Sequence, residues 1–242
     1  MADAHFEVPR LAEVYDPLDP RRRDLDVYVA IASEFGARTV LDIGCGTGTF
    51  ACLLAARGIE VIGVDPAAAS LDVARAKPGA TRVRWVQATA ADLPPLQVDL
   101  ATMTGNVAQV FLTDEEWGSV LQSAHAALRP GGRLVFETRD PAAKAWLGWN
   151  RADSLSRADI PGVGVVQAWV ELSAARGELV SFRSTFVFEA DRVTLTSDST
   201  LRFRRAEEVA DSLMSAGFVV DELRGAPDRP GRELVFVARQ SG

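Results

Sequence analysis

Three glycines at alternate positions, Gly44, Gly46 and Gly48, form the most distinctive stretch of the sequence. A short apolar run, residues 39–41, precedes them and predicts a buried strand, while an alanine-rich run, residues 50–57, follows them and predicts a helix. Glycines at this spacing let the backbone turn sharply and keep Cβ atoms away from an approaching ligand. A loop of this kind at the start of a helix is suited to binding a polar or anionic ligand.

Two acids accompany the glycines. Asp42 stands just before the first glycine, and Asp65 ends the next predicted strand, residues 59–64. An acid about 20 residues past the first glycine can accept hydrogen bonds from ribose hydroxyl groups, and we favour this role for Asp65 over that of a helix N-cap. Asp42 suits a ligand with a cationic amino group. Dinucleotide-binding loops read G-x-G-x-x-G, whereas Thr49 stands at the position of the last glycine here.

The run D-x-G-x-G-x-G from Asp42 to Gly48 resembles motif I of the class I S-adenosylmethionine-dependent methyltransferases. The resemblance covers residues 24–138 and resumes over residues 206–238. It implies an α/β fold, with a doubly wound, mostly parallel, seven-stranded Rossmann-like sheet whose last strand is antiparallel. It also implies S-adenosyl-L-methionine as the cofactor. The residues implied to contact this cofactor around its methionine part, ribose and adenosine are Asp42, Gly44, Cys45, Gly46, Asp65, Pro66 and Ala67.

The adenine end of the cofactor is implied by a second stretch. Residues 87–94 resemble the family's G-D-A-x-D-L-P, with Thr89 where the family has its first acid. The resemblance implies that the backbone amides of Ala90 and Ala91 read the edge of the ring. It also implies that Asp92 accepts a hydrogen bond from the amino group of the ring. Asp92 is equally suited to be a turn residue before the following proline.

Loops at the carboxyl ends of strands supply further candidates. Met103 and Asn106, at the end of the predicted strand 98–103, are candidate cofactor contacts, and Gln109 is a candidate acceptor contact, because sites lie at this edge of such sheets. Simple solvation is the alternative for the two amides. The loop lacks the (D/N)-P-P-(Y/F) motif of enzymes that methylate nucleobase amines or a protein glutamine. Tyr15 is implied, by resemblance to small-molecule methyltransferases, to close over the cofactor.

The acceptor pocket is expected beyond the fifth strand, residues 133–137. Glu137 and Arg139 are unusual in or just after a strand that should be buried on both faces. Trp146 and Trp149 follow, and we expect all four side chains near the mouth of the site. The alternative is that the two charged residues pair with each other or with the insertion and that the tryptophans belong to the core.

No catalytic residue is assigned from the sequence. The chain has only two histidines, His5 and His125, and neither is a convincing general base, His125 falling within the predicted helix 114–128. The methyl group of a sulfonium is already activated, so alignment with the nucleophile is the main requirement. Positioning of this kind can supply about 7–11 kcal/mol of the barrier.

Composition narrows the class of partner. The chain has 242 residues, 48% hydrophobic content and a formal charge of −7, so it can bury one large core and repels phosphate backbones, which disfavours nucleic acid. It has no long apolar run for a membrane and no signal-peptide pattern, so we expect a cytoplasmic protein. The two cysteines, Cys45 and Cys52, lack a second pair at ligand spacing, and no metal is expected.

Strands and helices alternate up to about residue 140, as in parallel βαβ units. Three strand-like runs, residues 163–172, 179–188 and 192–204, then predict an inserted antiparallel sheet, with hairpin turns at 174–177 and 190–191. Prolines rule out one long helix in the first 20 residues, residues 16–20 are expected to be turn-rich, and Arg21, Arg22 and Arg23 are expected to form a solvated basic face. The predicted division is an N-terminal cap and helix at 1–36, a cofactor-binding core at 37–140, a β lid at 141–204, and a C-terminal helix and strands at 205–242.

The sequence thus predicts a methyltransferase that moves a methyl group to an oxygen or nitrogen atom of a small molecule. Two alternatives stay open: an NAD(P)-dependent oxidoreductase, against which Asp42 and Gly48 argue, and a cofactor-binding module without catalysis. The inserted sheet is expected to act as a lid and is also suited to form a dimer face, so both a monomer and a homodimer are compatible with the sequence. Trimming residues 163–204 is expected to spare cofactor binding and to abolish turnover.

Overall fold

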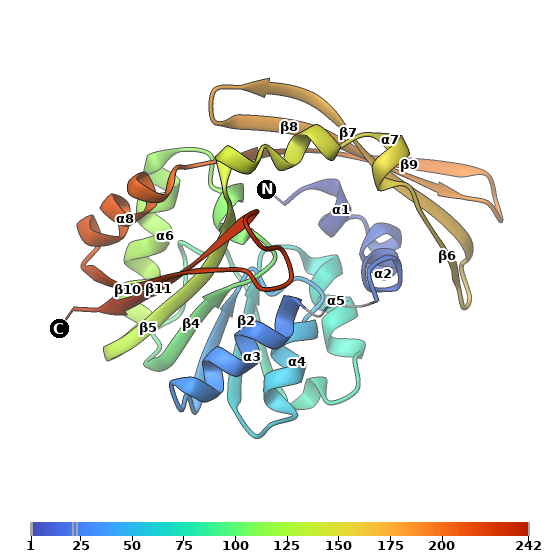
Figure 1. Cartoon of the computed structure of the whole chain (residues 1–242). Helices are drawn as coiled ribbons and strands as arrows, with labels where there is room; N and C mark the ends of the chain where they lie inside the picture. Colours follow the sequence, from blue (N-terminus) through green and yellow to red (C-terminus); the bar gives the residue numbers. More distant parts are fainter. Residues whose placement is uncertain (1, 21, 23, 242) are drawn as a thin grey trace.

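The computed structural model describes residues 2–20, 22 and 24–241, which form two β-sheets with flanking helices (Figure 1). The larger sheet has seven strands and the smaller has four. In Figure 1 the smaller sheet, yellow to orange, arches over the N-terminal helices, drawn in blue. No helix in this described part of the chain is both long enough and apolar enough to span a membrane.

The seven-stranded sheet confirms the predicted fold class. Its strands lie in the order β10-β11-β5-β4-β1-β2-β3. Strands β1 to β5 run parallel, whereas β11 runs antiparallel to both of its neighbours. Residues 129–132, which include two glycines, lie inside β5, where the pairing with β4 changes register. The bounds of the seven strands are β1 (Thr39–Ile43), β2 (Glu60–Asp65), β3 (Val83–Gln87), β4 (Val98–Met103), β5 (Leu128–Arg139), β10 (Phe218–Gly225) and β11 (Glu233–Gln240).

Helices bury both faces of this sheet. On one face α3 (Asp24–Glu34) and α4 (Thr49–Ala55) pack with alternate residues of the strands, such as Val40. On the other face α6 (Asp114–Ala127) and α8 (Ala206–Ser215) pack with the residues in between, such as Leu41. The remaining helical segments of the core and of the connection to the smaller sheet are α5 (Ala68–Ala76), α7 (Arg151–Ser154), η1 (Ala80–Arg82), η2 (Val107–Val110), η3 (Pro141–Ala143) and η4 (Ala145–Gly148).

The inserted sheet has one strand more than the sequence indicates. Its antiparallel strands, in the order β6-β7-β8-β9, are β6 (Ser156–Ile160), β7 (Gly164–Arg176), β8 (Leu179–Phe188) and β9 (Val193–Arg202). The short β6 has only one large apolar residue, Ile160, so its sequence gives a weak strand signal, and its pairing with β7 defines it as a strand. The turn expected at residues 174–177 was placed too early, because β7 continues to Arg176 and pairs with β8 up to that point.

Two helices at the N-terminus connect the two sheets. They are α1 (Ala4–Glu7) and α2 (Pro9–Leu18), so the prediction that the prolines exclude one long helix is confirmed. The expected turn at residues 16–20 is partly wrong, since α2 continues through Pro17. Leu11 and Val14 of α2 are fully buried against Phe186, Phe188 and other apolar residues of the inserted sheet. This packing outweighs the hydrogen bond that a proline removes from a helix.

The prediction for the three arginines is tested only at Arg22, because Arg21 and Arg23 lie outside the described residues. Arg22 is not solvated: its side chain is 17% exposed and pairs with Asp24 at 3.0 Å. Its charge therefore belongs to the interior of the site described below rather than to a basic surface.

A polar contact ties α2 to the glycine loop. Asp16 Oδ1 accepts hydrogen bonds from the hydroxyl groups of Thr47 (2.8 Å) and Thr49 (3.1 Å). Lys77, at the end of α5, pairs with Asp16 Oδ2 and also donates to the carbonyl oxygen of Thr47. The N-terminal helices are thus held at one end by the apolar cluster with the inserted sheet and at the other by the loop after β1.

We predict that Leu11→Ala destabilises the protein by about 2–5 kcal/mol, because a fully buried leucine is replaced in a closed cluster. Urea denaturation measures the change in unfolding free energy. The control is Leu147→Ala, since Leu147 is 70% exposed and a surface change of this kind should stay within about 0.5 kcal/mol. Equal effects of the two substitutions would show that α2 does not pack against the inserted sheet as described.

Candidate active site

Polar side chains replace apolar ones where the central strands end. Asp42 of β1 and Thr102 of β4 are register partners and are both fully buried. Glu137, two residues before the end of β5, is also buried. Glu233 joins them because β11 is antiparallel, so its first residue meets the carboxyl end of β5. With Asp65 at the end of β2, this edge of the sheet carries four buried carboxyl groups, which only a ligand or specific hydrogen bonds make tolerable.

The glycine loop is fastened to β2 through Asp65. Asp65 Oδ2 accepts from the backbone N–H of Gly46 and Oδ1 accepts from that of Ala67, both at 2.8 Å. Gly46 has φ +53°, and a Cβ built there would meet no atom within 4 Å, so its surroundings are open to a ligand. Gly48 is needed for a different reason, since a Cβ there would come within 2.4 Å of the Trp85 ring.

The carboxyl group of Asp42 has one atom left over. Its Oδ1 accepts from the Thr102 hydroxyl at 3.2 Å, while its Oδ2 is buried with no hydrogen-bond partner. Burial raises the pKa of Asp42 to about 7, against the opposing effect of the Thr102 hydrogen bond. A cation placed beside Oδ2 would restore the ionised form. The α-ammonium group of S-adenosylmethionine is such a cation.

Asp65 fits the ribose in a similar way. Burial raises the pKa of its carboxyl group, and the N–H groups of Ala67 and Gly46 oppose this effect. Each carboxylate oxygen has accepted one hydrogen bond and keeps capacity for another. The two hydroxyl groups of a ribose can use that capacity. The residues around the glycine loop therefore fit the predicted cofactor, with Asp42 facing its cationic end and Asp65 its ribose.

The other predicted cofactor residues differ in how far they are exposed. Cys45 is buried with a free thiol, and Met103 is fully buried in the core, so only its backbone is available. Pro66 is exposed beside Asp65. Asp92 is exposed and accepts from the Thr89 hydroxyl at 2.7 Å, as in the turn alternative. The structure leaves the neighbouring Ala90 and Ala91 in a loop, half-buried and exposed respectively, and their adenine contacts stay predictions.

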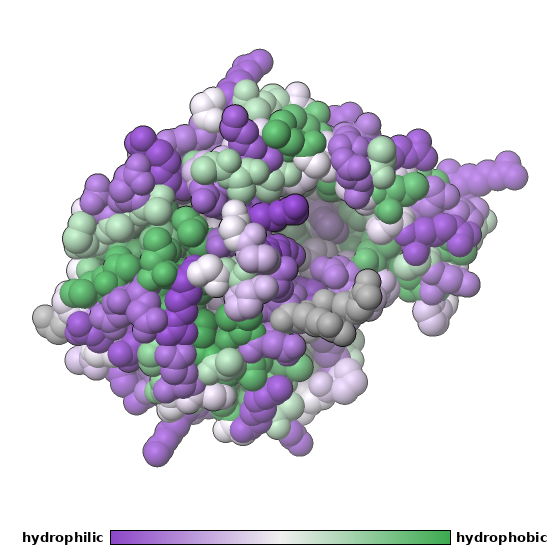
Figure 2. Space-filling view, viewed as in Figure 1, coloured by the Kyte–Doolittle hydropathy of each residue, from purple (hydrophilic) through white to green (hydrophobic). Residues whose placement is uncertain are grey.

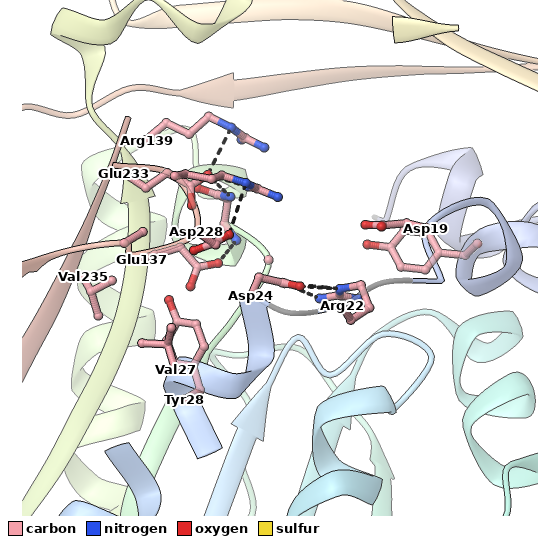
Figure 3. A pocket seen from close by; sticks show the side chains of 15 residues that line it. Asp19, Arg22, Asp24, Val27, Tyr28, Glu137, Arg139, Asp228, Glu233 and Val235 are labelled. Carbon is pink, nitrogen blue, oxygen red and sulfur yellow. Dashed lines mark hydrogen bonds and ion pairs between the residues drawn. The ribbon is translucent and has the colours of Figure 1, made fainter. Parts of the chain in front are cut away.

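A pocket with a volume of about 190 Å³ opens between the start of α3, the ends of β4 and β5, and the segment 226–235. Figure 3 shows its charged side chains converging from these elements, and Figure 2 shows a recess with many hydrophilic residues along its rim. Four of the predicted site residues line the pocket, namely Tyr15, Asn106, Glu137 and Arg139. The described lining residues without a sequence prediction include Arg22, Asp24, Tyr28, Asp228, Arg229 and Glu233.

Glu137, Asn106 and Glu233 form one network in the wall of this pocket. Glu137 Oε1 accepts from the backbone N–H of Asn106 at 2.8 Å, and Asn106 Nδ2 donates to Glu233 Oε1 at 3.2 Å. Burial raises the pKa of Glu137 to about 8, while the Asn106 N–H opposes this effect and Glu233 adds to it. Arg229 compensates Glu233 through a contact of 2.7 Å.

Arg139 does not pair with Glu137, which the sequence left open as an alternative. Its Nη1 donates to Gln109 Oε1 at 3.0 Å, and its Nε lies 3.9 Å from Glu233. Gln109 in turn donates to the carbonyl oxygen of Arg202 in β9 at 3.3 Å. The alternative in which Arg139 pairs with Glu137 is therefore not found, because the guanidinium group contacts Gln109 and Glu233 instead.

Trp146 and Trp149 lie at the joint between the two sheets. Both rings contact Phe203, at centroid distances of 4.7 Å and 6.1 Å. They are only half-buried, and the Arg139 guanidinium lies 5.7 Å from the centroid of Trp149. Neither ring is among the described residues that line the pocket. Their contact with an acceptor, like that of Gln109, stays a prediction.

We predict that Asp42→Asn raises stability more at pH 8 than at pH 5. The folded protein holds a proton on Asp42 that the unfolded chain releases near pH 4, so wild-type stability falls as pH rises toward about 7. Asparagine removes this loss, and each tenfold difference in proton affinity is worth about 1.4 kcal/mol. We expect a gain of about 2–4 kcal/mol at pH 8 and a smaller one at pH 5, measured by urea denaturation.

The control is Asp72→Asn, because Asp72 is exposed on α5. This change should leave stability within about 0.5 kcal/mol at both pH values. A gain for Asp42→Asn that is the same at pH 5 and pH 8 would contradict the burial of an uncompensated carboxyl group at this position.

Residues 40–132 match the model of a family described as a methyltransferase domain. The chain is 34% identical over 119 residues to cypemycin N-terminal methyltransferase of a Streptomyces species, with 49% of each chain covered. It is 34% identical over 115 residues to ubiquinone biosynthesis O-methyltransferase of Serratia proteamaculans, with 46% of each chain covered. The chain thus spans about half the length of the curated relatives it matches.

The likeness in three dimensions extends further along the chain. An S-adenosylmethionine-dependent methyltransferase from Clostridium acetobutylicum superposes with a TM-score of 0.78, covering 97% of this chain and 99% of the other at 17% identity. At that identity the comparison shows the fold alone. Together with the domain match and the loop geometry, it confirms the predicted resemblance: the chain contains a methyltransferase domain and has the fold of the class I S-adenosylmethionine-dependent methyltransferases.

Proposed function

We propose that this protein transfers the methyl group of S-adenosyl-L-methionine to an oxygen or nitrogen atom of a small molecule. The observation that carries the proposal is the pair of carboxyl groups around the glycine loop. Asp65 holds the loop and keeps acceptor capacity for a ribose, while Asp42 Oδ2 is buried without a partner. A ligand that combines an ammonium group with a ribose satisfies both. When bound, this cofactor supplies a methyl group activated by a positively charged sulfur.

The chain's own contribution is positioning. The side chains of Asp65 and Asp42 would hold the cofactor at the ends of β1 and β2, and the pocket beside Asn106 would hold the acceptor. The N-terminal helices and the inserted sheet would close over both and exclude water. Arrangements that hold two reactants in line can supply about 7–11 kcal/mol, which suits a reaction whose donor is already activated.

The names of the relatives are compatible with either an oxygen or a nitrogen atom as the methyl acceptor. One is named as an N-terminal methyltransferase and the other as an O-methyltransferase, and each matches this chain over about half of its length. The matched part, residues 40–132 in the family model, contains the glycine loop but not the acceptor side at Glu137 and Glu233. The acceptor must therefore be argued from residues outside the matched part. We also propose that two copies of the chain can associate through the inserted sheet.

We predict that Asp65→Asn weakens the binding of S-adenosylmethionine by about 10–100-fold. The amide can still accept from Ala67 but presents N–H donors to Gly46 and to the ribose hydroxyl groups, so charge-assisted hydrogen bonds worth about 1.5–3 kcal/mol are lost. Isothermal titration calorimetry with S-adenosylmethionine measures the change, and circular dichroism checks that the variant is folded.

Asp72→Asn again serves as the control, because Asp72 lies on the exposed side of α5, and it should bind like the wild type. Equal affinity of wild type and Asp65→Asn would remove the ribose assignment. Binding of NADH by the wild type with higher affinity than S-adenosylmethionine would replace the proposal with the oxidoreductase alternative.

A further inference from the structure

Two buried oxygen atoms in the wall of the pocket have no hydrogen-bond partner. They are Glu137 Oε2 and Asn106 Oδ1, on side chains that are 5% and 4% exposed. Their companion atoms are engaged, since Glu137 Oε1 accepts from the Asn106 backbone and Asn106 Nδ2 donates to Glu233. A buried acceptor left without a donor costs about 1–3 kcal/mol. The pair is therefore arranged for a ligand that donates hydrogen bonds.

The orientation of the Asn106 amide is set by its neighbour. Glu233 is a carboxylate held by Arg229 at 2.7 Å, and an ionised carboxylate can only accept hydrogen bonds. The Nδ2 group must therefore face Glu233, which leaves Oδ1 as the free atom. Asn106 also has φ +64°, a left-handed conformation that non-glycine residues seldom adopt. Such a backbone at the end of a strand is typical of a functional position.

The charges of the pocket favour a cation. Among its described lining residues, carboxyl groups outnumber guanidinium groups by five to three. The guanidinium groups are already paired, Arg22 with Asp24 at 3.0 Å, Arg229 with Glu233 at 2.7 Å, and Arg139 more loosely with Glu233 at 3.9 Å. In Figure 3 the Glu137 carboxyl group extends from β5 into the space between this wall and α3. A ligand with a positive charge and several N–H donors matches this wall.

We propose that the acceptor is an amine, that its N–H groups donate to Glu137 Oε2 and Asn106 Oδ1, and that Glu137 takes the proton that the nitrogen must lose. This inference rests on the proposed methyltransferase function and narrows it to N-methylation. A hydroxyl group has one donor and would leave one of the two oxygens without a partner, whereas a primary ammonium group has three donors. Glu137 would be the catalytic residue that the sequence alone does not reveal.

An ammonium acceptor gives one proton to the Glu137 carboxylate and becomes a neutral amine with a lone pair. The lone pair forms the new N–CH₃ bond while the S–CH₃ bond breaks, and the bonding electrons stay on sulfur as a neutral thioether. The product is an N-methylammonium ion, and Glu137 releases its proton to solvent before the next turnover.

The surroundings of Glu137 are suited to this exchange. Burial raises its pKa to about 8, the N–H groups of Asn106 and Gly105 lower it, and the charges of Glu233 on β11 and Asp24 on α3 raise it. A base with a pKa near the working pH both accepts and releases a proton readily, and a general base of this kind typically contributes 10²–10⁴-fold to the rate.

The first test uses S-adenosylmethionine with a labelled methyl group and a bacterial metabolite extract, split into an untreated half and a half treated with acetic anhydride in bicarbonate, which blocks amines. We expect labelled product in the untreated half only, with tandem mass spectrometry placing the label on nitrogen. Label on oxygen in either half overturns the amine acceptor but leaves the proposed function standing. No label in either half overturns both.

The second test compares Glu137→Gln with the wild type in the same extract. Glutamine keeps an oxygen for the Asn106 N–H but cannot take a proton, so labelled product should fall by about 100-fold or more. The affinity for S-adenosylmethionine, measured by calorimetry, should stay within about twofold, because the cofactor contacts Asp42 and Asp65 instead. Glu60→Gln, at the exposed start of β2, is the matched control and should behave like the wild type.

Glu137→Asp keeps the carboxylate at a greater distance from the acceptor and should recover part of the yield lost in Glu137→Gln. A loss of cofactor affinity in Glu137→Gln that matches the loss of product would overturn the proposal, because Glu137 would then hold the amino group of the cofactor. Full activity of Glu137→Gln would overturn it as well, as would an Asp variant no more active than the Gln variant when both are folded.

Discussion

The rest of the structure depends on the need to stabilise the buried carboxyl groups at one edge of the main sheet. Each needs hydrogen-bond donors or a cation, since an ionised group without them is strongly unfavourable in the interior. Asp65 obtains two backbone N–H groups, and in doing so fixes the glycine loop and the start of α5. Glu137 obtains the N–H of Asn106 on one oxygen only. The atoms left without donors at this edge, on Asp42, Asn106 and Glu137, are those to which we propose that ligands bind.

The N-terminal helices connect this edge of the main sheet to the inserted sheet. Asp16 of α2 contacts the glycine loop through Thr47 and Thr49, and Leu11 of the same helix is buried against the inserted sheet. On the other side, Gln109 bridges Arg139 of β5 and the backbone of β9. The inserted sheet is therefore connected to both the cofactor side and the acceptor side of the pocket. In the proposed function, closure over the two reactants and positioning of their binding residues would both depend on these contacts.

Most of the fold could be predicted from the sequence because its local patterns agree with its tertiary structure. The alternation of strands and helices and the spacing from Gly44 to Asp65 placed the glycine loop at the end of β1 and the acid at the end of β2. Strand β6 could not be predicted, because it is short, has Ile160 as its only large apolar residue, and is defined by its pairing with β7. The continuation of α2 through Pro17 likewise depends on tertiary packing.

The candidate site was predictable on its cofactor side and less so on its acceptor side. Glu137 was found because an acid is unexpected in a central strand. Glu233 could have been found by the same argument, since an antiparallel last strand begins where the parallel strands end. Arg22, Asp24 and Arg229 lie on segments whose sequence resembles ordinary charged surface. Only the folded arrangement brings them to one pocket.

The most direct measurement is a crystal structure of the protein with S-adenosylhomocysteine. We expect the ribose hydroxyl groups to donate to Asp65 and the ammonium group to lie beside Asp42 Oδ2. The sulfur should face a pocket in which Glu137 Oε2 and Asn106 Oδ1 remain available. A complex in which the ammonium group instead contacts Glu137, or in which the ribose lies away from Asp65, would contradict this arrangement.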